Sequence, residues 1–144
     1  MMILMINIKS LILLAIVTVI AVSCAKLFSK GGNKTMALNT YANVGVEEFQ
    51  TLIADQSVQL LDVRSQEEFD EGHIAGAILV DVNDTAFVEK AMAVLDTQRQ
   101  VAVYCRSGRR SARAANQLAA QGMKVTNLDG GVIAWQDSGK SLVK

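Results

Sequence analysis

The residue type best suited to covalent chemistry in this sequence is a cysteine that follows an apolar, strand-forming run. Cys105 comes directly after Val101–Tyr104, and a short loop rich in arginine, glycine and serine leads from it to the helix-forming segment 111–121. A loop between a strand and a helix places its backbone N–H groups at the positive end of that helix, where an anion binds well. The same position favours the thiolate form of a cysteine. The sequence therefore predicts a nucleophilic Cys105 in an anion-binding loop.

Positive charge is concentrated around this cysteine. Four of the six arginines of the chain follow Cys105 within eight residues: Arg106, Arg109, Arg110 and Arg113. A lone cysteine at the end of a core strand would be structural, but this cluster favours a nucleophile for anionic substrates. We expect the loop to bind substrate through six residues: Arg106, Ser107, Gly108, Arg109, Arg110 and Ser111. Gly108 permits an unusual backbone angle within this loop. Arg110 is expected to contact the negatively charged oxygens of the substrate. Arg113 is expected to lie on a solvated helix face.

Three segments resemble single-domain rhodanese-like sulfurtransferases, in the order and spacing of that family. The first is the cysteine loop, residues 104–111; the second is 62–77, with Asp-Val-Arg, Glu-Phe and Gly-His-Ile-Ala-Gly-Ala; the third is 130–135, Gly-Gly-Val-Ile-Ala-Trp. The resemblance extends over roughly residues 41–137. The resemblance implies a single α/β domain with a five-stranded parallel sheet, helices on both faces, and the cysteine loop at the carboxyl ends of the strands.

The resemblance also implies an activity. In this family the cysteine takes a sulfane sulfur from a donor such as thiosulfate, holds it as a persulfide and passes it to cyanide or a thiol. Cys105 is then the catalytic residue, and no metal or organic cofactor is implied. The expected partners are a small anionic sulfur donor and a thiol or cyanide acceptor, with a protein acceptor as an alternative.

Four other polar residues in the matching segments are interpreted as a structural brace: Asp62, Arg64, Glu68 and His73. The carboxylates could serve acid–base catalysis, but persulfide transfer needs no dedicated base if the thiolate is already ionised. His73 belongs to a structural turn of the family, with a Cys/His dyad as the alternative. One histidine with one cysteine is also too small a set for a zinc site, so no metal site is predicted.

The competing functions for a cysteine loop of this kind differ in the spacing from the cysteine to the arginine that they require. A cysteine phosphatase or arsenate reductase places an arginine after five intervening residues, and here that position is Ser111, whereas Arg110 comes one residue early. The shorter loop favours attack on sulfur over attack on phosphate. A non-enzymatic persulfide carrier and a partner-binding module of the same family remain alternatives.

The charge distribution excludes one class of partner. Lys and Arg number 14, as do Asp and Glu, so the formal net charge is zero. Acidic residues are absent between Asp96 and Asp129, which predicts a local basic face around the cysteine loop. Aromatic residues amount to only 5% of the chain. Because stacking side chains are sparse, this face is predicted to bind a small anion and not a nucleic acid.

The N-terminal segment has the pattern of an export signal. Lys9 precedes the uncharged run Leu11–Val22, and Ala21–Cys24 resembles the bacterial lipoprotein cleavage box, with Ala21 where that box more often has leucine. We therefore expect a signal peptide over 1–23, lipidation of Cys24 and an extracytoplasmic, periplasm-facing lipoprotein. An uncleaved membrane anchor is the alternative, although the uncharged run 10–25 is shorter than the roughly 18–20 residues that a spanning helix needs. Both interpretations, the lipoprotein and the uncleaved anchor, place the domain on a membrane tether outside the cytoplasm.

The remaining chain divides into a flexible tether over 24–38 and one domain over 39–144. Apolar periodicity and capping signals predict helices over 46–54, 65–71, 87–95, 111–121 and 132–136, and strands over 58–63, 77–80, 101–104 and 125–128. Strands that alternate with helices indicate a parallel sheet covered on both faces.

Overall fold

The computed structural model describes residues 40–144; the predicted signal peptide 1–23 and the tether 24–38, with Cys24, lie outside the described residues. Five strands form one sheet: β1 (Ala42–Val44), β2 (Gln59–Asp62), β3 (Ile78–Leu79), β4 (Val101–Tyr104) and β5 (Val125–Leu128). Their order is β1-β5-β4-β2-β3, and every neighbouring pair is parallel. The cysteine strand β4 is therefore central, and its carboxyl end lies between those of β2 and β5.

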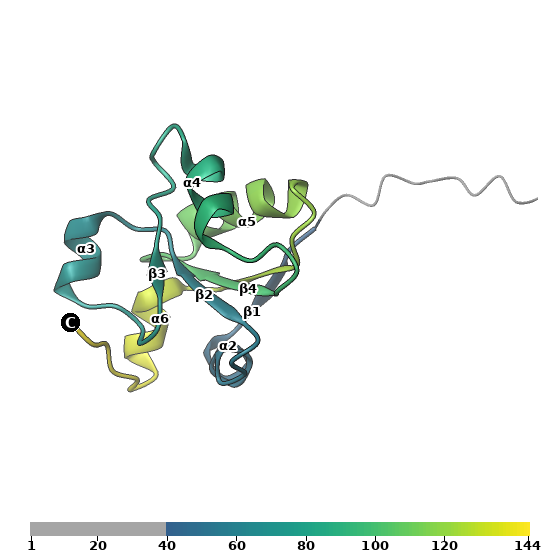
Figure 1. Cartoon of the computed structure of the whole chain (residues 1–144). Coiled ribbons are helices and arrows are strands. Elements are labelled where there is room, and N and C mark those ends of the chain that lie inside the picture. Colours follow the sequence, from purple (N-terminus) through teal and green to yellow (C-terminus); the bar gives the residue numbers. More distant parts are fainter. Residues whose placement is uncertain (1–39) are drawn as a thin grey trace, which may run out of the picture. The chain divides into compact units, whose positions relative to one another are not determined.

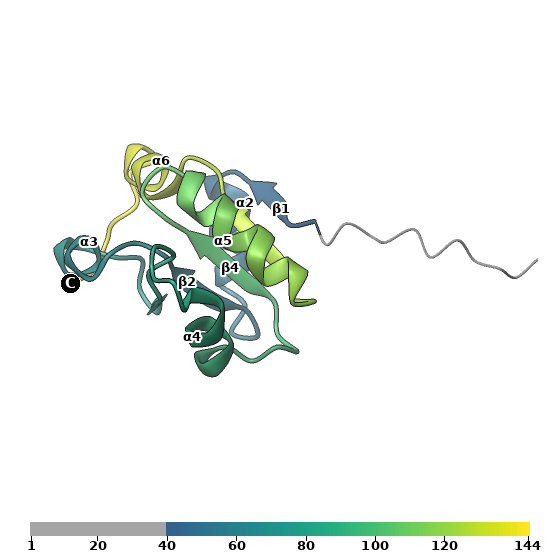
Figure 2. The same ribbon diagram turned by 90° about the horizontal axis from the view of Figure 1, so that it is seen from above.

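Five helices accompany the sheet: α2 (Val46–Ile53), α3 (Gln66–Glu71), α4 (Phe87–Val94), α5 (Arg109–Ala120) and α6 (Gly131–Asp137). Helices α4 and α5 cover one face, while α2 and α6 cover the other (Figure 1). Figure 2 shows α5 running across the sheet, with α3 off its edge near the C-terminus. Within residues 40–144, no helix is both long enough and apolar enough to cross a membrane.

Alternating residues of the central strands fill two separate cores. Leu61 and Val103 pack with α4 and α5, whereas Leu60 and Tyr104 pack on the opposite face with α2 and α6. All four strand positions of β4 are buried, as expected for a parallel sheet covered on both faces. Each fully buried large apolar side chain contributes about 1.5–3 kcal/mol relative to exposure.

The predicted fold class is confirmed, with three local differences. Strand β1 was not predicted, because Ala42-Asn43-Val44 is short, partly polar and largely exposed at the sheet edge. The expected strand 77–80 has only Ile78 and Leu79 in the ladder. Helix α5 begins at Arg109 and not at residue 111, because Gly108 adopts a left-handed conformation (φ 88°) that turns the chain directly into the helix. Arg109 and Arg110 therefore belong to the first helical turn.

Candidate active site

Cys105 is the first residue after β4, and its free thiol is fully buried. The Sγ atom accepts hydrogen bonds from the Gly108 backbone N–H (3.2 Å) and from the Ser111 hydroxyl (3.3 Å). The Ser111 Oγ also lies 3.2 Å from the Gly108 carbonyl oxygen. A hydroxyl carries one proton, so a thiolate at Cys105 draws that proton toward sulfur through the stronger, charge-assisted bond.

This environment stabilises the thiolate. Burial is the largest single influence and raises the pKa of Cys105, whereas hydrogen bonds from the Ser111 hydroxyl and from the amides of Ser111, Ser107 and Gly108 lower it. The lowering influences prevail, so the pKa of Cys105 lies below its ordinary value. The responsible groups are fixed donors of the loop and of the first turn of α5. Cys105 is thus prepared for nucleophilic attack.

Helix α6 holds the cysteine loop from the other side. The Val132 N–H donates to the Cys105 carbonyl oxygen (2.9 Å), and the Ile133 N–H donates to the Arg106 carbonyl oxygen (3.1 Å). Gly131 makes this approach possible, since a Cβ atom there would lie 2.4 Å from the Cys105 carbonyl oxygen. The Gly-Gly-Val-Ile segment therefore positions the loop through main-chain contacts.

Arg110, in the first turn of α5, forms a bidentate ion pair with Glu68 of α3. Its two terminal nitrogens each lie 2.7 Å from a carboxylate oxygen. Glu68 also accepts a bond from the Ser65 N–H (3.2 Å), and the Ser65 hydroxyl accepts from the Glu68 N–H (3.3 Å), which completes a capping box. Chiefly through the Arg110 hydrogen bonds, the pKa of Glu68 is lowered to about 2. The sequence predicted a structural role for Glu68 in a brace and in the helix cap, but it did not link Glu68 with Arg110.

Asp62 and Arg64 form a separate, buried pair at the end of β2. The Arg64 Nη2 atom lies 2.7 Å from Asp62 Oδ2 and donates to the Gly72 carbonyl oxygen at 2.8 Å. The guanidinium also lies over the Tyr104 ring, 5.8 Å from its centroid. This arrangement connects the carboxyl end of β2 with the end of α3 and with the strand that carries Cys105.

His73 lies in a turn that binds the C-terminal segment. Its ring stacks on Phe69 with 3.7 Å between ring centroids, and Nδ1 lies 3.1 Å from the Phe69 carbonyl oxygen. Its backbone pairs with Val143 through two hydrogen bonds of 2.9 and 2.8 Å. Among residues 40–144, the groups that hydrogen-bond to the Cys105 sulfur come from Gly108 and Ser111 and not from this imidazole.

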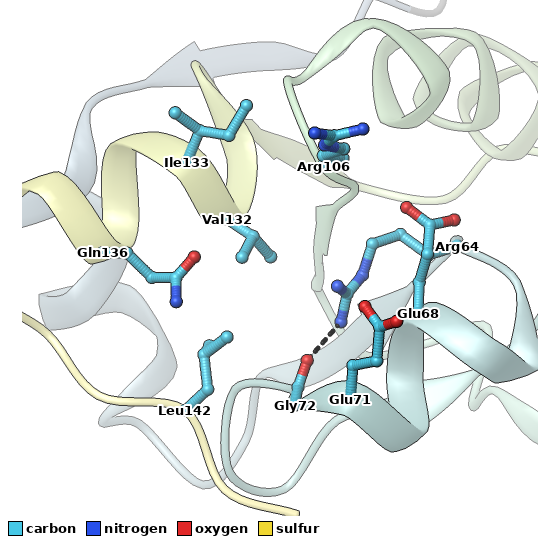
Figure 3. Close-up of a pocket in the computed structure, with 9 residues that line it drawn as sticks. All are labelled: Arg64, Glu68, Glu71, Gly72, Arg106, Val132, Ile133, Gln136 and Leu142. Carbon is cyan, nitrogen blue, oxygen red and sulfur yellow. Dashed lines mark hydrogen bonds between the residues drawn. The ribbon is translucent and has the colours of Figure 1, made fainter.

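Two hollows flank the loop. The arginine hollow, of about 380 Å³, is lined by Ser107, Arg109, Arg110 and Arg113. Arg113 thus faces this hollow, where it also donates to Asn83 Oδ1 (2.9 Å). The α3–α6 hollow, of about 430 Å³, lies between those two helices and has Arg106 at its rim (Figure 3). Because Glu68 lines one hollow and Arg110 the other, their ion pair joins the two rims. The described part of the chain has no group of three or more potential ligands that could hold a metal ion.

A buried cysteine at the carboxyl end of a parallel sheet, held by amide donors with arginines nearby, is an arrangement that can form a covalent intermediate on its sulfur. Comparison with known proteins identifies the family. Residues 45–138 match the Rhodanese-like domain family. The chain therefore belongs to the rhodanese-like family, and its relatives include named sulfurtransferases.

Three relatives illustrate the match. Thiosulfate sulfurtransferase 18 of Arabidopsis thaliana is 36% identical over 107 residues, which cover 66% of this chain and 78% of the relative. Thiosulfate sulfurtransferase GlpE of Shewanella oneidensis is 32% identical over 103 residues, covering 70% and 98%. The crystal structure of a rhodanese-related protein from Thermoplasma volcanium has a TM-score of 0.63 at 26% identity and covers 72% of this chain and 98% of that chain. The similarity therefore extends over nearly the whole described domain.

Proposed function

We propose that this protein is a thiosulfate sulfurtransferase in which Cys105 carries the transferred sulfur as a persulfide. The observation that carries the proposal is the hydrogen bonding of the Cys105 sulfur by the Gly108 amide and the Ser111 hydroxyl, next to a hollow lined by arginines. These contacts favour a thiolate and also provide donors for the additional charge of a persulfide.

In the first step the Cys105 thiolate attacks the outer sulfur of thiosulfate. The new bond joins Sγ to that sulfur, the sulfur–sulfur bond of thiosulfate breaks, and sulfite leaves with the bonding electron pair. Thiosulfate and sulfite are both dianions, so a hollow lined by arginines binds them better than a neutral surface would. The side chains of Arg109 and Arg113 are exposed in this hollow, whereas the positive charge of Arg110 is already paired with Glu68.

In the second step an acceptor nucleophile attacks the outer sulfur of the persulfide. Cyanide leaves as thiocyanate, or a thiolate leaves as a new persulfide, and the electron pair of the broken bond returns to Sγ. No proton needs to be moved by a separate base once the attacking group is ionised. This supports structural roles for Asp62, Arg64 and His73.

Phosphate chemistry is the competing function for this type of loop. The spacing from Cys105 to Arg110 is one residue shorter than in cysteine phosphatases, and Arg110 is already paired with Glu68. Both features support sulfur transfer over phosphate-ester hydrolysis. A persulfide carrier with a protein acceptor would use the same first step and would differ in the second.

We further propose that Cys24 is lipidated and that the domain is tethered outside the cytoplasm. The support is the uncharged run before Ser23-Cys24 in the sequence. Labelling cells with a lipid precursor tests this: a labelled mature protein is expected, and an unlabelled protein that still begins at Met1 would favour the uncleaved anchor.

Thiocyanate formation from thiosulfate and cyanide tests the enzymatic proposal. The wild-type protein should turn over, and Cys105→Ser should be inactive because a serine hydroxyl is not ionised at neutral pH. The same preparations should show negligible hydrolysis of aryl phosphates. Phosphatase turnover by the wild type that disappears in Cys105→Ser would instead support the competing function.

A further inference from the structure

The α3–α6 hollow is larger than cyanide requires. Its volume of about 430 Å³ lies in the range that binds small organic molecules. It begins at Arg106, the residue next to the nucleophile, and extends between α3 and α6 (Figure 3). Arg106 therefore connects this hollow to the cysteine loop.

Two charges of opposite sign in this hollow have no ion-pair partner within residues 40–144. Arg64 is paired with Asp62, and Glu68 is paired with Arg110. Arg106 and Glu71 are exposed, and neither takes part in an ion pair of the described domain. Figure 3 places Arg106 and Glu71 at different points of the rim, on the loop and on α3 respectively. A ligand with both a negative and a positive group would complement them.

The wall opposite α3 is mostly apolar. Val132, Ile133 and Leu142 line it together with the polar Gln136, and Ile133 remains 45% exposed although it adjoins the cysteine loop. Such a surface suits the carbon chain of a ligand whose polar groups are held elsewhere. The arginine hollow differs, because its lining consists of Ser107 and three arginines. The two sides of the loop are thus suited to different molecules.

We propose that the α3–α6 hollow binds the sulfur acceptor, and that this acceptor is a small zwitterionic thiol of the amino-acid type. The carboxylate of the acceptor pairs with Arg106, its ammonium group pairs with Glu71, and its carbon chain lies on Val132 and Ile133. The assignment rests on the proposed sulfurtransferase function and names the acceptor for the same cysteine.

The chemical step balances without a further reactant. The acceptor thiol loses its proton to solvent and attacks the outer sulfur of the Cys105 persulfide as a thiolate. A new sulfur–sulfur bond forms on the acceptor, the bond from Sγ to the outer sulfur breaks, and its electron pair returns to Sγ. One thiolate and one persulfide are consumed and one of each is formed, so there is no net oxidation or reduction.

Single-turnover discharge tests the proposal. The protein is loaded with thiosulfate, freed of excess donor, and mixed with one of four acceptors: cysteine, cysteamine, 3-mercaptopropionate or cyanide. Loss of the persulfide is followed by intact-mass measurement. Each rate in a variant is divided by the wild-type rate with the same acceptor, which cancels differences in the intrinsic reactivity of the thiols.

Glu71→Gln should slow discharge by cysteine and by cysteamine about fivefold relative to discharge by 3-mercaptopropionate, because only the first two carry an ammonium group. Arg106→Gln should produce the complementary pattern and slow cysteine and 3-mercaptopropionate relative to cysteamine. Glu67→Gln is the matched control, since Glu67 is an exposed acid of α3 that does not line the hollow. This variant should leave all the ratios unchanged.

Two results would overturn the proposal, and they differ in what else they reject. Loaded protein whose acceptor ratios are the same in Glu71→Gln, Arg106→Gln and wild type would reject the zwitterionic acceptor and leave the sulfurtransferase function intact. A wild-type protein that gains no sulfur from thiosulfate would reject that function together with the acceptor.

Discussion

Arg110 and Glu68 form a bidentate pair, with both N–O distances at 2.7 Å, that connects the end of the cysteine loop to the first turn of α3. Each partner has a second role, since Arg110 lies in the first turn of α5 and Glu68 completes the capping box of α3. The pair therefore sets the position of the loop while it neutralises one of the charges available to an anionic donor.

Glu68→Gln should lower the KM for thiosulfate about threefold. Glutamine at this position preserves the capping box, so the substitution removes mainly the negative charge and leaves Arg110 free to attract the donor. The cost in stability should be at most about 1 kcal/mol, because the pair is partly exposed. Steady-state kinetics at fixed cyanide, with Glu67→Gln as control, measure the effect. A higher KM in Glu68→Gln would show that Arg110 needs its partner to bind the donor.

The same ion pair should make the free energy of unfolding depend on pH in the acid range. The pKa of Glu68 is lowered to about 2 in the folded protein, against 4.5 for an unperturbed glutamate. A lowered pKa stabilises the fold above the unfolded value, and this contribution is lost as the pH falls from about 4.5 toward 2. The difference in free energy of unfolding between wild type and Glu68→Gln should shrink over that interval. Urea titrations at several pH values test this, and a constant difference would contradict it.

Ser111→Ala should raise the pKa of Cys105, because it removes the hydroxyl that hydrogen-bonds to Sγ. A hydrogen bond to a charged group is worth about 1.5–3 kcal/mol, so sulfur loading at a pH below the wild-type alkylation midpoint should slow by roughly tenfold. The rate of iodoacetamide alkylation against pH reports the midpoint, in protein that also carries Cys24→Ser.

Two control variants accompany Ser111→Ala. Ser107→Ala keeps the backbone amide that acts on Cys105, and His73→Ala removes a ring that hydrogen-bonds to Phe69. Both should leave the alkylation midpoint near that of the wild type. A large rise in His73→Ala alone would support the Cys/His dyad instead.

Gly131→Ala should disturb both stability and the cysteine loop. Its φ is +58°, and the added Cβ would lie 2.4 Å from the Cys105 carbonyl oxygen. Gly139→Ala is the matched control, with a φ of +77° and no atom within 4 Å of the added Cβ. The control should lose about 1–2 kcal/mol from backbone strain alone, and Gly131→Ala should lose about 1–3 kcal/mol more. Equal losses in urea unfolding would mean that α6 does not fix the loop.

Much of the fold could be predicted because its elements have strong local signals. Strand β4 is a continuous, largely apolar run, and the pattern of Ser65 followed by Glu68 indicates the start of α3. Strand β1 has no such signal, since it is held by pairing with β5 and not by its own composition. The start of α5 was misplaced because Gly108 acts as a left-handed N-cap, and the sequence suggests only that such a conformation is allowed.

The site was predictable in its chemistry but not in its contacts. Cys105 and its loop are contiguous, so their juxtaposition follows from the sequence. Glu68 and Arg110 are 42 residues apart, and their meeting depends on β2 lying beside β4. The α3–α6 hollow likewise requires α3, α6 and Leu142 to converge, which local patterns do not specify.

The most direct test of the account is the location of the sulfur after reaction with thiosulfate. Intact-mass measurement of the Cys24→Ser protein should show the gain of one sulfur atom, and peptide mapping should place it on Cys105. Addition of cyanide should remove the sulfur and restore the original mass, and the protein with Cys105→Ser as well should never gain it. Thiocyanate production without a sulfur adduct on Cys105, or turnover that persists in Cys105→Ser, would contradict the persulfide mechanism.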